Sequence, residues 1–267
     1  MEIAQYKEIL EKQFCADYSV TSSLLQSKEN VFVPIINHPG RRVFRDKDSF
    51  LKVLSYRNKL VICCKDESML SWCKENFKDT PAAWFAKFKN LRKLDQKLRE
   101  YRHKICDTHH YYIPSDNFEK VTFRKSCDDY SLCLLEKSDL LYFKGNEHFS
   151  NALSFDQKAP DVLAIAALHK TDFISGVPCD DWQNRICGMA GASMDSPLMW
   201  QIGIDVLETS RNSGIATYLV WHLAKEILNR DILPFYGTSD SHNHSKAVAF
   251  RCGFVPTWWE LYSESVI

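Results

Sequence analysis

One stretch decides the fold: residues 200–216 read WQIGIDVLETSRNSGIA. Its first part, Trp200–Val206, has the composition and length of a β-strand, and residues 207–213, polar apart from Leu207, follow as a short turn. The next segment, Gly214–Arg230, has the apolar periodicity of an amphipathic helix. A strand, a tight turn and a helix are therefore expected to follow one another directly.

Such a turn is suited to binding phosphate. The first turns of a helix leave backbone N–H groups unpaired, and the helix dipole adds partial positive charge there. Small residues at Ser213, Gly214 and Ala216 would let the backbone approach a phosphate closely, and Arg211 would add a charged contact. We therefore predict a pyrophosphate-binding loop at Arg211–Ala216.

Two common nucleotide-binding motifs are absent. The chain has no G-x-x-x-x-G-K-S/T string, so the turn is not a P-loop. Residues 187–193, CGMAGAS, hold two glycines, but they do not form G-x-G-x-x-G leading into a helix.

The loop and the segments after it resemble the general-control-related N-acetyltransferase (GNAT) family. Arg211–Ala216 fits that family's pattern of Gln or Arg, two variable residues, Gly, one variable residue, and Gly or Ala. The strand around Phe235–Thr238, the helix after it and the closing Gly253–Phe254 are similar to the family's next elements. Residues 149–154 and 159–165 resemble two-domain GNAT proteins related to the zwittermicin A resistance acetyltransferase.

The resemblance implies an α/β fold with a mixed sheet: a GNAT acyl-CoA N-acyltransferase domain, 126–267, preceded by an N-terminal α/β domain, 1–125. It implies acetyl-CoA as co-substrate, with the pantetheine arm lying along the fourth strand and the pyrophosphate on the loop amides. The residues expected to bind it are Ile204, Val206, Arg211, Asn212, Ser213, Gly214, Ile215, Ala216, Asn243 and Ser245.

The chain departs from the family pattern at two positions. The family usually has Asn eleven residues before the closing glycine; that position is His242, and we assign the role to Asn243, one step on. Many members have a Tyr four residues before that glycine as general acid, and here the position is Ala249. If the protein is an enzyme, either another group serves as the acid or none is needed. A coenzyme A thiol resembles a cysteine thiol, with a pKa of about 8.5, so departure of the thiolate without a proton donor is feasible.

Transfer to an amine also needs a base, because a lysine-like amine with a pKa of about 10.4 is mostly protonated at neutral pH. Asp205 on the strand is the first candidate and Glu208 in the turn is the second. Each has a plainer alternative. Asp205 would be a structural carboxylate that caps nearby backbone, and Glu208 an exposed acid of a turn.

Composition bears on whether the protein binds nucleic acid, crosses a membrane, is secreted or holds a metal. The chain has 34 basic and 34 acidic residues among 267, which is not the basic excess of a nucleic-acid-binding protein. The longest apolar run, Val162–Leu168, is too short for a membrane span, and the first residues do not read as a secretory signal. The ten cysteines, Cys179 among them, include no C-x-x-C pair, so we expect reduced thiols in the cytoplasm. No metal site is expected at His242 and His244.

The N-terminal part alternates helices and strands. We expect a helix over Met1–Phe14, a strand over Leu60–Cys64 and a helix over Asp66–Phe77. Pro81 is expected to open a long helix that runs to about Ile105, and His109–Pro114 to form a connection near the domain boundary.

The predicted function is transfer of acetyl from acetyl-CoA to an amine of a small, antibiotic-like molecule by direct attack. Transfer to a protein or peptide amine is the enzymatic alternative. A non-catalytic acyl-CoA sensor would bind without turnover, and a pure interaction protein would not bind coenzyme A at all. No nucleic-acid or membrane partner is expected.

Overall fold

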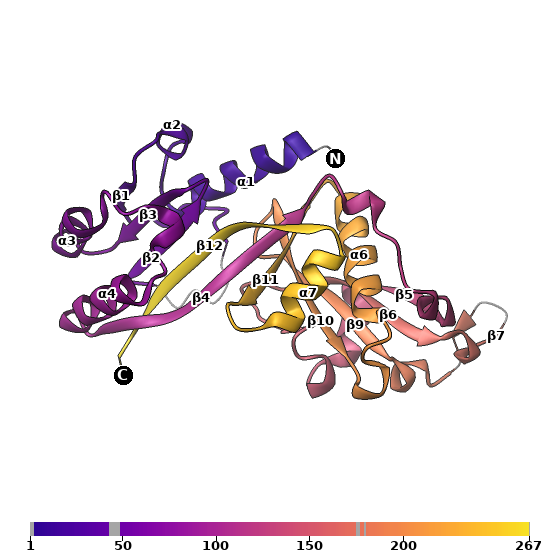
Figure 1. The fold of residues 1–267 in the computed structure, drawn as a ribbon. Helices are drawn as coiled ribbons and strands as arrows, with labels where there is room; N and C mark the ends of the chain where they lie inside the picture. The colour runs from indigo at the N-terminus through magenta and orange to yellow at the C-terminus, as the bar shows by residue number, and fades with distance from the viewer. Residues whose placement is uncertain (1–2, 43–48, 175–176, 179, 267) are drawn as a thin grey trace. The chain divides into compact units, whose positions relative to one another are not determined.

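The computed structural model of the protein describes residues 3–42, 49–174, 177–178 and 180–266. Cys179 and the first two residues of the predicted N-terminal helix lie outside these ranges. The chain divides into two units (Figure 1). The N-terminal unit comprises Glu2–Tyr111, Thr238–His242 and Pro256–Ile267; the C-terminal unit comprises Tyr112–Gly237 and Asn243–Val255, together with Met1.

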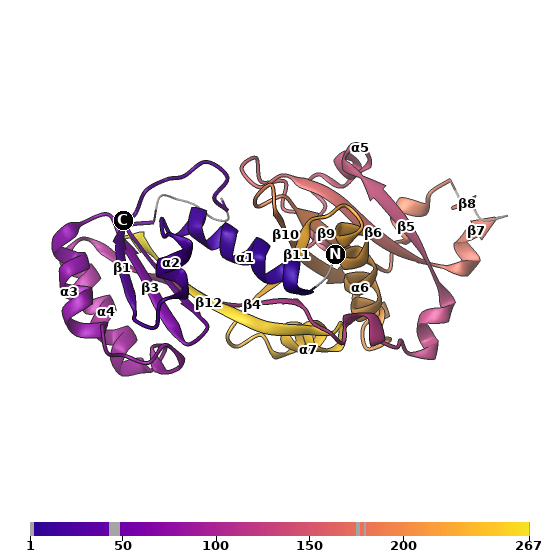
Figure 2. The same cartoon turned by 90° about the horizontal axis from the view of Figure 1, so that it is seen from above.

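The N-terminal unit is an α/β structure, seen from a second side in Figure 2. Its sheet has the strand order β1-β3-β2-β12-β4, in which β1 is parallel to β3, and β2 is antiparallel to β3 and to β12. Its elements are α1 (Ile3–Asp17), α2 (Ser22–Gln26), β1 (Val31–Pro34), β2 (Leu51–Tyr56), β3 (Lys59–Cys64), α3 (Glu67–Phe77), α4 (Phe88–Glu100), and the greater parts of β4 (His103–Pro114) and β12 (Phe254–Ser265).

The core of this unit forms where α3 and α4 pack on the sheet. Strand β3 is buried along its whole length, and the fully buried Phe77 and Phe85 meet edge to face with ring centroids 5.2 Å apart. Helix α3 begins as predicted, because the Asp66 side chain accepts a hydrogen bond of 2.8 Å from the amide of Met69.

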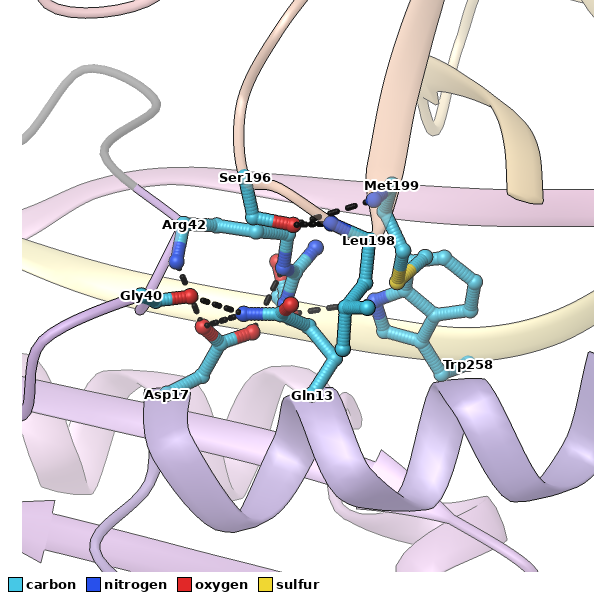
Figure 3. Close-up of polar contacts among 9 residues, drawn as sticks. Gln13, Asp17, Gly40, Arg42, Ser196, Leu198, Met199 and Trp258 are labelled. Carbon is cyan, nitrogen blue, oxygen red and sulfur yellow. Dashed lines mark hydrogen bonds and ion pairs between the residues drawn. The ribbon is translucent and has the colours of Figure 1, made fainter. Parts of the chain in front are cut away.

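A buried ion-pair network ties the segment around Arg42 to α1 and β12. The Arg42 guanidinium pairs with Asp17, at 2.6 Å, and with Glu260. Gln13 donates to the same aspartate at 2.8 Å and to the carbonyl of Gly40 at 2.9 Å (Figure 3). The Arg42 side chain is only 8% exposed, so the two carboxylates compensate a charge that has been removed from water.

The C-terminal unit contains five strands of the mixed sheet. Its strand order is β11-β10-β9-β6-β5, in which β10 is parallel to β11 and the other neighbours are antiparallel. Its elements are β5 (Tyr130–Glu136), α5 (Lys137–Leu140), β6 (Asp161–His169), β7 (Phe173–Ile174), β8 (Val177–Pro178), β9 (Gly188–Ser193), β10 (Met199–Val206), α6 (Ile215–Leu228), β11 (Leu233–Ser239) and α7 (Asn243–Arg251).

Helix α6 covers one face of this sheet, where it packs on β6, β9 and β10 (Figure 1). The approach is close: a Cβ at Gly188 would lie 3.1 Å from the Leu219 side chain. The opposite face is covered by residues 151–152, because a Cβ at Gly203 would lie 1.9 Å from the carbonyl oxygen of Asn151. Glycine on β10 therefore permits a backbone-to-backbone contact that any larger residue would prevent.

Two expectations for the N-terminal part were wrong. The long helix predicted from Pro81 to Ile105 is a 3-10 turn, Ala82–Trp84, followed by α4, which ends at Glu100. Arg102 has a left-handed φ of 58°, which a helix cannot continue, and the chain turns there into β4. Residues 109–114 lie within β4 and do not form a connection.

The predicted fold class, an α/β protein with a mixed sheet, is confirmed. The predicted domain boundary at residue 125 stays a prediction. In the structure the first long segment of the N-terminal unit ends at Tyr111, and this unit also includes the segment that begins at Pro256.

Candidate functional site

Strands β10 and β11 separate partway along their length. Their parallel pairing runs from Met199 and Leu233 to Ile202 and Tyr236. Beyond that point β10 continues to Val206 and β11 continues to Ser239. Among the described residues, these last parts of the two strands are not paired with each other. On its other edge β10 stays paired with β9 as far as Val206. The last part of β10 therefore has one paired edge and one open edge.

The alternation of a β-strand determines which backbone groups face the open edge. The carbonyl of Met199 and the amide of Leu207 both bond toward the β9 side, at 3.2 and 2.9 Å. The carbonyl of Leu198 instead accepts from β11, at 3.0 Å. Even-numbered residues of β10 therefore direct their N–H and C=O groups toward β11. By this alternation Ile204 and Val206, two predicted binding residues, present their backbone at the open edge.

The predicted pyrophosphate loop comes directly after β10 and has an unusual backbone. Asn212 has a φ of 64° and Gly214 a φ of 94°, so two left-handed residues precede the first turn of α6. The Ser213 hydroxyl donates to the carbonyl of Ser210 at 2.7 Å and accepts from the amide of Ile215 at 3.3 Å. Alternating left-handed residues in a turn align successive N–H groups around a concavity that suits an anion.

The amides of this loop are available to a ligand. Within the described part of the chain, the backbone N–H groups of Ser213, Gly214 and Ala216 donate no hydrogen bond. Arg211 is exposed and forms no ion pair with any described residue. The amides and guanidinium could bind the two negative charges of a diphosphate, with α6 adding its dipole.

Two loop contacts come from a segment that sequence reasoning missed. Arg124 Nη1 donates to the carbonyl of Asn212 at 2.8 Å, and Ser126 Oγ donates to the carbonyl of Ser213 at 2.6 Å. These pairs are 88 and 87 residues apart in the chain. No local pattern around residue 124 signals such contacts.

The carboxylate of Asp205 is held by residues 151–152. Its Oδ2 accepts from the amides of Asn151, at 2.8 Å, and Ala152, at 2.9 Å, and its Oδ1 accepts from Asn151 Nδ2 at 2.7 Å. This geometry is that of a structural carboxylate, the alternative to a catalytic base. Glu208 lies in the 3-10 turn Glu208–Ser210 and is exposed, with no side-chain bond among the described residues. A catalytic role for either acid stays a prediction.

Helix α7 carries the remaining predicted residues. Asn243, its first residue, is exposed. The hydroxyl of Ser245 lies 2.9 Å from that of Tyr236 on β11. Burial raises the pKa of Tyr236 to about 12, so this phenol keeps its proton at neutral pH. Ala249, at the position where many GNAT proteins have tyrosine, is fully buried one turn after Ser245.

Metal-binding clusters and reactive thiols are the other kinds of site relevant to the described residues. No cluster of three or more His, Cys, Asp or Glu side chains that could hold a metal occurs among the described residues. Burial raises the pKa of the Cys64 thiol to about 11 and that of Cys63 to about 12, so both stay protonated. None of the helices in the described ranges has the length and apolar character that a membrane crossing requires.

Solved structures give distant likenesses. A GCN5-related N-acetyltransferase-like protein from Streptococcus suis is 13% identical, with a TM-score of 0.44, over 98% of this chain and 99% of its own. A GNAT-family acetyltransferase from Colwellia psychrerythraea is 9% identical, with a TM-score of 0.44, over 98% and 97%. A GNAT-family protein from Novosphingobium aromaticivorans is 12% identical, with a TM-score of 0.39, over 61% and 66%. Similarity at this level carries no information on substrate.

Curated proteins give no match to the chain. A family model, in contrast, does match the chain. Residues 145–254 match the model of the Acetyltransferase (GNAT) family. The matched segment is less than half of the chain, and it holds β6, β9, β10, the loop, α6, β11 and α7. In this segment the chain is similar to the GNAT acetyltransferases, a family of acyltransferases, and the predicted GNAT fold is confirmed.

Proposed function

We propose that the C-terminal unit binds acetyl-CoA and transfers its acetyl group to an amine of a small molecule. The observation that carries the proposal is the combination, inside the matched segment, of an open strand edge and a loop of unpaired amides. The amides of Ser213, Gly214 and Ala216 would hold the pyrophosphate, with Arg211 as counter-charge. The backbone of Ile204 and Val206 would pair with the amide groups of the pantetheine arm.

Acetyl-CoA supplies a thioester, and the residues of β10 would position it for attack. An N–H group at the open edge of β10 is suited to stabilise the negative charge that develops on the thioester oxygen when an amine attacks. As the new C–N bond forms, the C–S bond breaks and the thiolate leaves. The amine must also lose a proton. We assign this step to Glu208 in preference to Asp205, whose carboxylate already accepts three hydrogen bonds.

The acceptor is assigned only as a class. The resemblance to two-domain GNAT proteins related to the zwittermicin A resistance acetyltransferase favours an antibiotic-like amine over a protein lysine. A second candidate function is a non-catalytic acyl-CoA sensor. Ala249 favours it, because the helix offers no phenol at the position where many relatives have one.

Calorimetric titration with acetyl-CoA and with free coenzyme A tests the binding site. Saturable one-site binding supports the proposal, and turnover with an amine panel then separates the enzyme from the sensor. Absence of binding to both ligands would contradict both functions.

A pair of variants that differ only in charge tests whether the loop binds the pyrophosphate. Gly214→Glu is a poor choice, because a side chain at a φ of 94° is strained and its Cβ would lie 3.1 Å from Arg124. Ala216→Glu adds a carboxylate at the first turn of α6, where the dipole favours it, and opposes a bound diphosphate. We expect Ala216→Glu to reduce affinity at least about tenfold more than the isosteric Ala216→Gln, since one unit of like charge is worth about 1.4 kcal/mol or more at close range. Equal losses would show that bulk, not charge, is responsible.

A further inference from the structure

We propose that Arg124 and Ser126 are positioning residues that set the loop 212–214 in its anion-binding conformation. The inference rests on the proposed function, since it concerns the loop assigned to the pyrophosphate. Both residues precede the segment 145–254 that matches the family model, so the match itself does not assign them. We call the two side chains the loop clamp.

The loop clamp fixes the orientation of two successive peptide groups. In a trans peptide the C=O of one residue and the N–H of the next point in opposite directions. The clamp binds the carbonyls of Asn212 and Ser213, at 2.8 and 2.6 Å. The N–H groups of Ser213 and Gly214 must therefore point away from the clamp. These are two of the amides that donate no hydrogen bond within the described chain.

The clamp also supports a strained backbone. Asn212 is a non-glycine residue with a φ of 64°, a conformation that costs about 1 kcal/mol for an L-residue. The bond from Arg124 to the carbonyl of Asn212 offsets this cost. The methylene groups of Arg124 lie along Gly214, since a Cβ at Gly214 would lie 3.1 Å from Arg124 Cδ and 3.4 Å from its Cγ. One side chain thus contacts both left-handed positions.

The segment that carries the clamp is anchored on the same helix that begins at the loop. Trp221 of α6 donates from Nε1 to the carbonyl of Phe118 at 2.8 Å, and the two rings stack with centroids 5.4 Å apart. Phe123 packs edge to face on Tyr218 and Trp221, with centroid distances of 4.9 and 5.3 Å. Segment 118–126 and the loop are therefore placed by one rigid element, which keeps the clamp in register with its carbonyls.

The test is calorimetric titration of the full chain with coenzyme A and with dephospho-coenzyme A, which lacks the 3′-phosphate but keeps the diphosphate. The variants are Arg124→Met, which keeps length but removes the donors, Arg124→Lys, which keeps a donor, and Ser126→Ala. Lys125→Met is the control, because it removes the same charge from an exposed neighbour that forms no bond to another described residue. Thermal unfolding of each variant checks that the fold is retained.

We expect Arg124→Met to weaken both ligands about tenfold, the loss of one charge-assisted bond, and Ser126→Ala about threefold to fivefold. Arg124→Lys should recover most of the loss, and Lys125→Met should stay within about twofold of the wild type. Equal affinity of Arg124→Met and the wild type for both ligands would overturn the inference while leaving the proposed function intact.

Two other outcomes also decide the matter. A loss seen with coenzyme A but not with dephospho-coenzyme A would mean that Arg124 contacts the 3′-phosphate directly, and the positioning role would be rejected. If the wild type binds neither ligand, the proposed function fails, and the clamp has no ligand to serve.

Discussion

Replacing Asp205 tests whether its carboxylate is a structural acceptor. Asp205→Ala leaves three donors without their partner: the amides of Asn151 and Ala152 and the side-chain amide of Asn151. The two bonds from Asn151 are exposed, so water can replace the carboxylate, and each is worth about 0.5 kcal/mol. The bond from Ala152 is partly buried and involves a charge, so its loss costs about 1–1.5 kcal/mol. Asp205→Ala should therefore lower the free energy of unfolding by about 2–2.5 kcal/mol.

Asp205→Asn is the finer perturbation. The amide oxygen of the new side chain can still accept from both backbone N–H groups, but its NH₂ group faces the NH₂ group of Asn151. Rotation of the Asn151 amide by half a turn removes that conflict, so the loss should be below about 1 kcal/mol. In the double variant Asp205→Asn with Asn151→Asp, the carboxylate changes sides and the side-chain bond is restored. The double variant should therefore be at least as stable as Asp205→Asn alone.

Urea unfolding followed by circular dichroism measures these differences, with Glu208→Ala as the exposed-carboxylate control that should stay within about 0.5 kcal/mol of the wild type. A loss below about 0.5 kcal/mol for Asp205→Ala would refute the structural reasoning. The catalytic alternative has its own signature: Asp205→Asn would keep its stability and its acetyl-CoA binding but lose turnover.

Three further predictions concern stability. Arg42→Met leaves two buried carboxylates without their counter-ion and should lower the free energy of unfolding in urea by about 3–5 kcal/mol. The control Arg57→Met removes a half-exposed ion pair and should lower it by less than about 1 kcal/mol. Similar losses in the two variants would contradict the burial argument. Burial, aided by a neighbouring lysine, lowers the pKa of His222 below 6.5, so the unfolded state binds the proton more tightly and stability should fall as the pH drops below about 6.5. His222→Gln should flatten that part of the unfolding profile, and an unchanged profile would reject the assignment. Tyr236→Phe removes the hydrogen bond to Ser245 and should lower the free energy of unfolding by about 1 kcal/mol. The loss should be equal at pH 6 and pH 9, because the Tyr236 pKa of about 12 lies above both. A loss that differs between pH 6 and pH 9 would show that another group titrates.

The local part of the candidate site could be predicted from the sequence. Strand β10, the polar turn and α6 follow one another without interruption, and turn chemistry and helix periodicity act over a few residues. The α3 cap at Asp66 is equally local, since its side chain and the amide it accepts from are three residues apart. The free loop amides and the open edge lie at positions that the family resemblance assigns to the ligand, and the binding role of these residues stays a prediction.

The features that the sequence did not predict depend on distant partners. The three donors to Asp205 are 53 and 54 residues away, and the loop clamp is still farther along the chain. Strand β2 escaped notice because no turn motif of the usual Gly-containing kind precedes β3; Arg57 and Asn58 make that turn with positive φ values. Helix α4 was extended too far because a single left-handed residue, Arg102, has no reliable signature.

The discontinuous make-up of the N-terminal unit has a consequence for synthesis. Strand β12 pairs with β2, as at Trp258 and Tyr56, and Glu260 meets Arg42 across 218 residues of chain. Closing so long a loop is slow, and a ribosome releases β12 only after it has made the C-terminal unit that lies between β4 and β12 in the chain. The N-terminal unit should therefore reach its native state after the C-terminal unit, although its first strands are made earlier. A fragment that stops at residue 125 would lack one of its inner strands, so an attempt to express that half alone should yield an aggregating chain instead of a folded domain.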